Sequence, residues 1–486
     1  MAMMDNSLRS AVNPVARIAL PWLAVIVAAI FSGTLAAGNA NSVLGQKPAL
    51  LLLGALVAGS FLVMFLFLGS SAVLVWPVAA TGGYLLQVPR GHVVLTFDRV
   101  WIFGLLAYIA VSGRQIPRTP ATRLLVSALF ILVASFGLRA LTTTHDFEPV
   151  KVWVDSIILP AILFVACERY CLPGADRARR LAGSLMIAGG ILGLIGIAER
   201  LWGFELATLS GGTARFDAAI DTTRVSGPYP APEPYALTLA ICLAATLYWL
   251  NTRSRGSRAG WGLVLVGVQG TAIALALFRA GWLAAILVVI AAFGYRPGRF
   301  GRTFAVVGLV GVVALAASLQ LQSNSTASKR LDNTENIKQR LATYKQGIEI
   351  FRTAPVFGVG VDQYNAVAQN RPPATVSGVE SQPWPHSTYF GALAEQGIIG
   401  FIPVLLLSYA VWRVIAAFRA LSFRSREATL LLGAVTGAAL AYFVMSLTLT
   451  MLPYEASNTF FFAFLGGASG RLDALERETQ PPSAPA

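Results

Sequence analysis

Apolar stretches of about 17–22 residues dominate the chain, and they end at short polar or arginine-containing connections. The stretches are rich in Leu, Ala, Val and Gly and show no period-2 alternation, so spanning β-strands are excluded. Their length suits a helix that crosses a hydrocarbon core of roughly 30 Å. The pattern predicts an all-α polytopic membrane protein with about 12–14 transmembrane helices.

The predicted spans are residues 18–37, 48–68, 71–87, 99–112, 123–141, 152–168, 181–198, 235–251, 260–277, 280–295, 304–321, 397–416, 428–448 and 458–470. We interpret the first as a retained span, because no small-residue cleavage site clearly ends a short apolar region there. The predicted organisation is N-terminal transmembrane helices (1–198), a first extracytoplasmic loop (199–234), central transmembrane helices (235–321), a large extracytoplasmic loop (322–396), C-terminal transmembrane helices (397–470) and a cytoplasmic tail (471–486).

Composition supports a membrane class. The chain has 486 residues, of which 56% are hydrophobic and 12% charged, whereas a soluble protein has about 25% charged residues. The net charge of +14 is compatible with nucleic-acid binding. The sequence contains no continuous basic groove, RRM aromatic pair or zinc finger, so we exclude nucleic acid as a partner. The three cysteines lie in or beside predicted spans and indicate neither a disulfide nor a metal cluster.

The arginine distribution predicts the orientation. Arginines concentrate in the loops near 113–122, 169–180, 252–259, 296–303 and 413–427. The short loops expected on the opposite side lie near 38–47, 142–151 and 449–457. Their only positively charged residues are Lys47 and Lys151. Because positive residues favour cytoplasmic loops, both termini are predicted inside and the two long loops outside.

The two long loops are expected to be functional rather than disordered. The first contains a proline-rich segment at 227–234, and the second contains a predicted amphipathic helix at 337–352. Apolar positions at helical spacing in that helix are Leu341, Tyr344, Ile348 and Phe351. We expect the helix to lie on the membrane surface and to cover part of a cavity.

Two outward arginines are candidate anion ligands. Arg279 lies between two apolar stretches with almost no loop, and a charge near membrane depth usually faces a cavity or a partner. The alternative is an arginine that snorkels to the interface at a hairpin tip. Arg224 is by itself an ordinary solvated loop arginine, but beside Arg279 it would form a clamp whose planar guanidinium groups match phosphate oxygens.

His386 is the candidate base. It is one of three histidines, and a neutral imidazole near an interface can accept a proton from a hydroxyl group at neutral pH. The alternative is a structural histidine with its hydrogen bonds satisfied.

These residues carry a resemblance to a known family. His386-Ser387, followed after nine residues by Gly397-Ile398-Ile399-Gly400, resembles the His-[Asn/Ser/Gln]-x9-Gly-x-x-Gly pattern of bacterial O-antigen ligases. The segments around Arg224, Arg279, Arg340 and 355–360 are similar to the wider O-antigen ligase and polymerase superfamily. The resemblance covers residues 200–410, roughly, and the span count.

The resemblance implies a GT-C-like membrane glycosyltransferase of the bacterial inner membrane whose active site faces the periplasm. The donor would be a glycan on undecaprenyl diphosphate, and the acceptor would be a sugar hydroxyl on a glycan or glycolipid. Arg224 and Arg279 would hold the diphosphate and His386 would activate the acceptor, with Arg340, Tyr344 and Ser387 as possible supporting residues. No cofactor is expected, and no carboxylate spacing on the outer side indicates a metal site.

Two alternatives stay open. A repeat-unit polysaccharide polymerase of the same superfamily would use the same donor and differ only in its acceptor. A transporter or flippase of a lipid-linked glycan would also have a basic cavity, but transporters often show repeated halves with broken helices in both, and no internal repeat is visible here.

Overall fold

The computed structural model describes residues 68–83, 97–112, 116–143, 148–204, 206, 216–217, 222–252, 257–295, 335–450 and 454–479. Helices form most of these residues: η1 (Gly69–Leu74), α5 (Trp76–Gly83), α6 (Phe97–Ser112), α7 (Pro120–Thr143), α8 (Glu148–Trp153), the π-helix η3 (Val154–Ile158), α9 (Leu159–Cys171), α10 (Ala175–Trp202), α12 (Pro232–Thr252), α13 (Ser257–Leu275), α14 (Arg279–Gly294), α17 (Glu335–Thr353), α18 (Tyr364–Gln369), α19 (Thr388–Ser422), α20 (Arg426–Thr448) and α21 (Glu455–Thr479). The strands in these ranges form two short antiparallel pairs, β1 (Phe216–Asp217) with β2 (Thr222–Thr223) and β3 (Thr375–Val376) with β4 (Val379–Glu380).

The prediction of an all-α polytopic membrane protein is confirmed. Within the described ranges, six helices are long and apolar enough to cross a membrane: Pro120–Thr143, Glu148–Cys171, Ala175–Trp202, Pro232–Thr252, Thr388–Ser422 and Arg426–Thr448. Two shorter apolar helices, Gly260–Leu275 and Arg279–Gly294, accompany them. The predicted spans 18–37 and 304–321 lie outside the described residues, as does all of 48–68 except its last residue.

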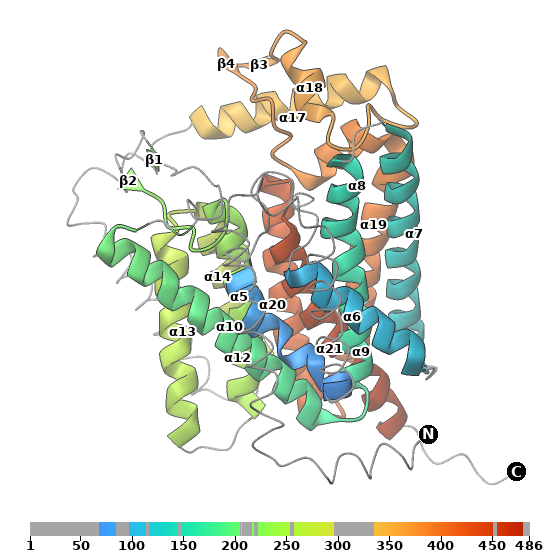
Figure 1. Cartoon of the computed structure of the whole chain (residues 1–486), viewed down its shortest axis with the longest axis vertical. Helices are drawn as coiled ribbons and strands as arrows, with labels where there is room; N and C mark the ends of the chain where they lie inside the picture. The colour runs from blue at the N-terminus through green and yellow to red at the C-terminus, as the bar shows by residue number, and fades with distance from the viewer. Residues whose placement is uncertain are drawn as a thin grey trace, which may run out of the picture.

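Side-chain exposure separates a lipid-facing surface from a packed centre. Phe130, Leu138 and Leu263 are 72%, 64% and 58% exposed, which is the normal environment of an apolar side chain on the outside of a membrane bundle. Helix α12 is the innermost described span, with 89% of its apolar window buried (Figure 1). The segment that follows the predicted anion ligand Arg224 therefore runs through the centre of the bundle.

Small residues allow the helices around α12 to approach closely. A Cβ atom on Gly433 of α20 would lie 2.8 Å from the Ala291 carbonyl oxygen of α14. A Cβ atom on Gly470 of α21 would lie 2.1 Å from the Glu168 carbonyl oxygen of α9. Membrane helices lack a hydrophobic driving force for association, and they rely on this kind of close backbone packing.

Two helices extend beyond the spans predicted from the sequence. Helix α19 begins at Thr388, before the start predicted at 397, and α21 continues to Thr479 through the segment predicted as a tail from 471. The reason at 471 is that Arg471 is only 5% exposed, because it pairs with Glu427 (Nε–Oε1 2.8 Å) and Glu478 (Nη1–Oε1 2.7 Å). A hydropathy pattern ends a span at such charges, whereas ion pairing allows the helix to continue.

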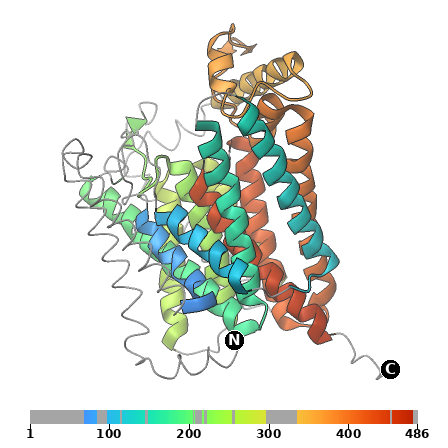
Figure 2. The same cartoon turned by 45° about the vertical axis from the view of Figure 1, so that its right-hand side comes forward.

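A module of α17, α18 and the β3–β4 hairpin lies across one end of the bundle (Figures 1 and 2). The predicted helix at 337–352 is present as α17. Its predicted apolar face is not the face that packs most deeply: Leu341 is 49% exposed, whereas Ala342, Thr343 and Ile350 are fully buried. Ile350 forms a small core with Tyr364, Ala368 and Ala394. This packing turns the predicted apolar face of the helix, which contains Leu341, toward the outside.

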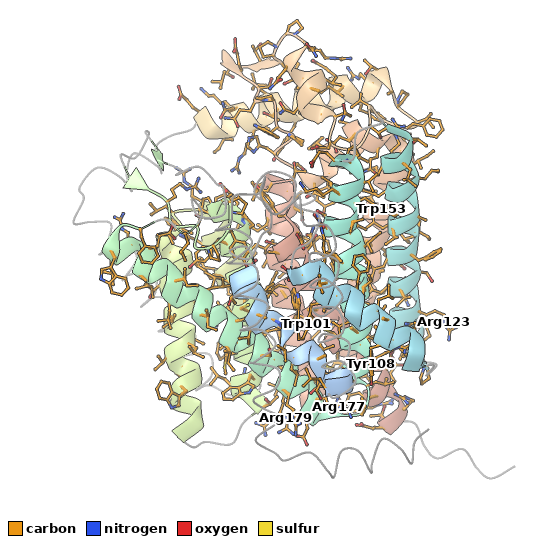
Figure 3. The ribbon with its side chains drawn as sticks, in the orientation of Figure 1. Trp101, Tyr108, Arg123, Trp153, Arg177 and Arg179 are labelled. Atoms are coloured by element: carbon orange, nitrogen blue, oxygen red, sulfur yellow. The ribbon has the colours of Figure 1, made fainter. Side chains whose placement is uncertain are left out.

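Three arginines from in or beside the predicted cytoplasmic loops lie at one end of the bundle. Arg123, Arg177 and Arg179 lie at the end away from the α17 module (Figure 3). The side of the membrane that each end faces stays a prediction.

Candidate functional site

The loop that carries Arg224 is held by a buried carboxylate. The backbone N–H groups of Ser226 and Gly227 both donate to Glu199 Oε2, at 3.2 and 2.7 Å. Gly227 has φ 57°, and a Cβ atom there would lie 2.8 Å from the Tyr235 ring. Glycine is therefore required at this turn by both its backbone angle and its space.

Arg224 lies close to the Arg279 turn. Its guanidinium Nη1 is 3.2 Å from Glu233 Oε1, and the two side chains are 13% and 11% exposed. Its Cζ atom lies 5.8 Å from the centroid of the Phe278 ring, at the residue that precedes Arg279. The structure thus brings the two predicted anion ligands into one region.

Arg279 is the first residue of α14 and follows a tight break between α13 and α14. Leu277 has φ 51° and Phe278 is extended, so the chain reverses within Ala276–Phe278. The Trp282 indole N–H fastens this break by donating to the carbonyl oxygens of Ile273 and Ala274, at 3.2 and 3.3 Å. Arg279 Nη2 is buried and has no hydrogen-bond partner within the described part of the chain, so the guanidinium retains a donor for an anion.

His386 lies immediately before α19 in a strained backbone conformation, with φ 46°. Its Nε2 atom is hydrogen-bonded to the amide oxygen of Gln382. Because an amide oxygen only accepts, Nε2 carries the proton and Nδ1 is left to accept one.

The surroundings of His386 keep its imidazole neutral. Burial is the larger cause and the positive charge of Arg340 adds to it, while the charge of Glu233 acts in the opposite direction; together they lower the pKa of His386 from 6.5 to about 4. Glu233 therefore affects both the arginines and the histidine. It pairs with Arg224, and its negative charge acts on His386.

The predicted supporting residues Tyr344 and Ser387 contact the end of α20. Tyr344 Oη donates to the Leu447 carbonyl oxygen at 2.7 Å, and Ser387 Oγ donates to the Ser446 carbonyl oxygen at 3.4 Å. These bonds satisfy carbonyl groups that a helix leaves unpaired at its C-terminus. Both residues hold α17 and the His386 segment onto α20, and Arg340 reaches His386 through its charge.

The Gly358–Gly360 turn and the Gly397–Gly400 segment interlock. The N–H groups of Val359 and Gly360 donate to the carbonyl oxygens of Ala394 and Glu395, at 3.0 and 2.7 Å. In return the Ile398 N–H donates to the Pro355 carbonyl oxygen at 3.0 Å. Gly397 has φ 61° and kinks α19 at this contact, so the glycines of both motifs serve to join the module to the bundle.

Arg139 of α7 fastens the same turn. Its guanidinium donates to the carbonyl oxygens of Phe357 and Gly358, at 2.7 and 2.9 Å. No motif in the sequence singles out Arg139, Glu199, Gln382 or Glu233 as a site residue. Each acts through a partner in another turn or element, so no local pattern indicates its role.

No group of three or more His, Cys, Asp or Glu side chains in the described residues is arranged to hold a metal ion.

Residues 269–405 match the family model described as O-antigen ligase. The match confirms the resemblance to O-antigen ligases over this segment, and it supports a glycan-transferring function of the ligase and polymerase type in general. The matched segment contains Arg279, Arg340, Tyr344, His386 and Ser387, whereas Arg224 precedes it. A comparison with curated proteins found no match.

Proposed function

We propose that this protein is an O-antigen ligase-like glycosyltransferase that moves a glycan from undecaprenyl diphosphate to the hydroxyl group of an acceptor sugar. The reaction takes place at the outer face of the bacterial inner membrane, where the α17 module would lie. The observation that carries the proposal is the combination of a buried, unsatisfied Arg279 Nη2 with a neutral His386 that has an accepting nitrogen.

The two arginines act on the leaving group. As the bond between the sugar anomeric carbon and the diphosphate oxygen breaks, the electron pair and the negative charge move to the diphosphate. Arg279 offers an unpaired donor to that charge, and Arg224 adds a second guanidinium nearby. Fixed cations stabilise a transition state most where the charge develops, and they need no reorganisation to do so.

His386 acts on the acceptor. Its Nδ1 takes the proton from the acceptor hydroxyl while the hydroxyl oxygen bonds to the anomeric carbon. A single displacement of this kind inverts the anomeric configuration, and it needs no protein nucleophile and no metal ion. Burial, and after it the positive charge of Arg340, keep the imidazole neutral by raising the energy of its charged form.

The surface of the module suits a position beside lipid. Ile337 and Phe357 are 56% and 57% exposed, and both are apolar. Membrane lipids would cover these side chains when the module rests on the outer leaflet. A lipid-linked donor would then reach the arginines without leaving the membrane.

The test is incubation of purified protein with a defined undecaprenyl-diphosphate glycan and a panel of acceptors. Release of undecaprenyl diphosphate together with a lengthened acceptor would establish the transferase. A lipid A core acceptor would assign a ligase, and a second copy of the repeat unit would assign a polymerase. Movement of the intact lipid-linked glycan across a vesicle membrane, without transfer to any acceptor, would overturn the proposal in favour of a flippase.

A further inference from the structure

Glu233 is a buried carboxylate with one oxygen in use and one free. It lies in the first turn of α12 and is 8% exposed. Oε1 pairs with Arg224 at 3.2 Å. Oε2 is buried and has no hydrogen-bond partner within the described part of the chain.

An unsatisfied buried carboxylate oxygen is costly, because it has lost its water and gained nothing in return. Arg224 contacts the Phe278 ring, and the next residue, Arg279, is the opposite case: its Nη2 is a buried donor that has no acceptor among the residues that the structure describes. A ligand that completes both groups must present an acceptor to Arg279 and a donor to Glu233. A phosphate joined to a hydroxylated ring has both.

We propose that Glu233 recognises the first sugar of the donor, by accepting a hydrogen bond from a ring hydroxyl or amide N–H at Oε2. This inference rests on the proposed function and adds to it a residue that selects the sugar. A phosphate is not the partner of Oε2, because two anions repel each other and neither has a hydrogen to donate. The sugar is the part of a glycosyl diphosphate that lies next to the phosphates and carries donors.

The pairing with Arg224 has a second consequence. Glu233 Oε1 is bound to the same guanidinium that the diphosphate would use. The carboxylate therefore weakens the hold of Arg224 on a bare diphosphate, while the sugar contact offsets this for the intact donor. The site would thus prefer the donor over the undecaprenyl diphosphate that it releases.

This difference gives a test in which only the sugar-bearing ligand should bind more weakly to the variants. The affinity of purified protein is measured for bare undecaprenyl diphosphate and for undecaprenyl diphosphate bearing glucose, galactose or N-acetylglucosamine. Glu233→Gln removes the charge and keeps the shape. It should weaken binding of the preferred sugar-bearing ligand by about 10-fold or more, the usual effect of losing a charged hydrogen bond. Binding of the bare diphosphate should stay the same or tighten.

Glu233→Asp is the second variant, since it keeps the charge but withdraws the carboxylate by one methylene. It should also weaken binding of the sugar-bearing ligand, and the affinity for the bare diphosphate should stay at the parent value. Glu349→Gln, on α17, is the matched control and should change neither affinity. Thermal unfolding in detergent checks that each variant is folded.

The inference is overturned if the variants lower the affinity for both ligands by the same factor, because Glu233 would then only orient Arg224. It is also overturned if the parent protein prefers no sugar-bearing ligand over the bare diphosphate. Failure of the proposed function gives a different result, in which the parent protein transfers glycan from the sugar-bearing ligands to no acceptor, whatever its affinities for them.

Discussion

At the scale of single residues, the chemistry depends on how partners set the state of each charged group. His386 is held neutral by burial and by Arg340, and Gln382 fixes which nitrogen carries the proton. Arg279 Nη2 has no partner in the described part of the chain, whereas Arg224 is paired with Glu233. The proposed site thus combines a neutral imidazole, the proposed base, with two guanidinium groups that would bind an anion.

The pKa of His386 predicts an unusual pH profile. The active form of the base is neutral, so transfer should stay level from about pH 8 down to about pH 5.5 and fall only as the pH approaches the His386 pKa of about 4. Arg340→Gln removes a positive neighbour, so it should raise the pKa of His386 and move the acid limb to higher pH. The measurement is kcat/KM for the acceptor against pH.

Arg352→Gln, an exposed arginine on the same helix, is the control and should leave the profile unchanged. A parent profile that already falls through pH 6.5, the ordinary value for histidine, would show that the imidazole is not held neutral.

Replacement of Arg279 tests the anion ligand. Arg279→Lys keeps the charge but loses the planar fork, so it should weaken donor binding by about 10-fold if the diphosphate is held bidentately. The readout is the affinity for bare undecaprenyl diphosphate, which lacks the sugar. Unchanged affinity would mean that Arg279 only extends to the membrane–water interface and does not bind the diphosphate.

The sequence identifies Arg279 and His386 because a charge near membrane depth and a histidine beside a glycine motif are visible locally. It does not single out Glu233 or Gln382, since the fold decides that Glu233 pairs with Arg224 and that Gln382 reaches the His386 ring. Tyr344 and Ser387 are predicted as supporting residues, and the structure shows the carbonyl groups of α20 that they contact.

At the scale of elements, the His386 segment is positioned by the interlock between the Gly358 turn and the α19 kink. A Cβ atom on Gly397 would lie 2.4 Å from the Val356 carbonyl oxygen, and the residue has φ 61°. Most spans are predictable because apolar length alone defines them. The start of α19 and the continuation of α21 are not, because they depend on tertiary hydrogen bonds and ion pairs.

Gly397→Ala tests the interlock. Backbone strain and overlap should cost about 1–3 kcal/mol in stability and reduce transfer, because the segment that carries His386, between the module and α19, loses its fixed place on the bundle. Thermal unfolding in detergent and transfer rate are the measurements. Gly267→Ala in α13 is the control, since a Cβ atom there meets nothing within 4 Å. Equal stability of the two variants would contradict the role of the interlock.

At the scale of the whole molecule, the account requires the α17 module to face outward. In the Thr375→Cys variant, the new cysteine should react with an impermeant thiol reagent added from outside. In the Asp176→Cys variant, it should react only after the membrane is permeabilised. The native Cys167, Cys171 and Cys242 are buried and give little background. Labelling of position 375 only from the cytoplasm would place the site on the wrong side for an exported lipid-linked donor.

The central claim is that one protein binds a lipid diphosphate through its arginines and transfers its glycan through His386. The most direct measurement compares His386→Ala with the parent protein, using the same undecaprenyl-diphosphate glycan for donor affinity and for single-turnover transfer. The account predicts donor affinity close to that of the parent and transfer slower by about 10²–10⁴-fold, the range for a lost general base. Transfer at the parent rate by a folded His386→Ala protein would contradict it.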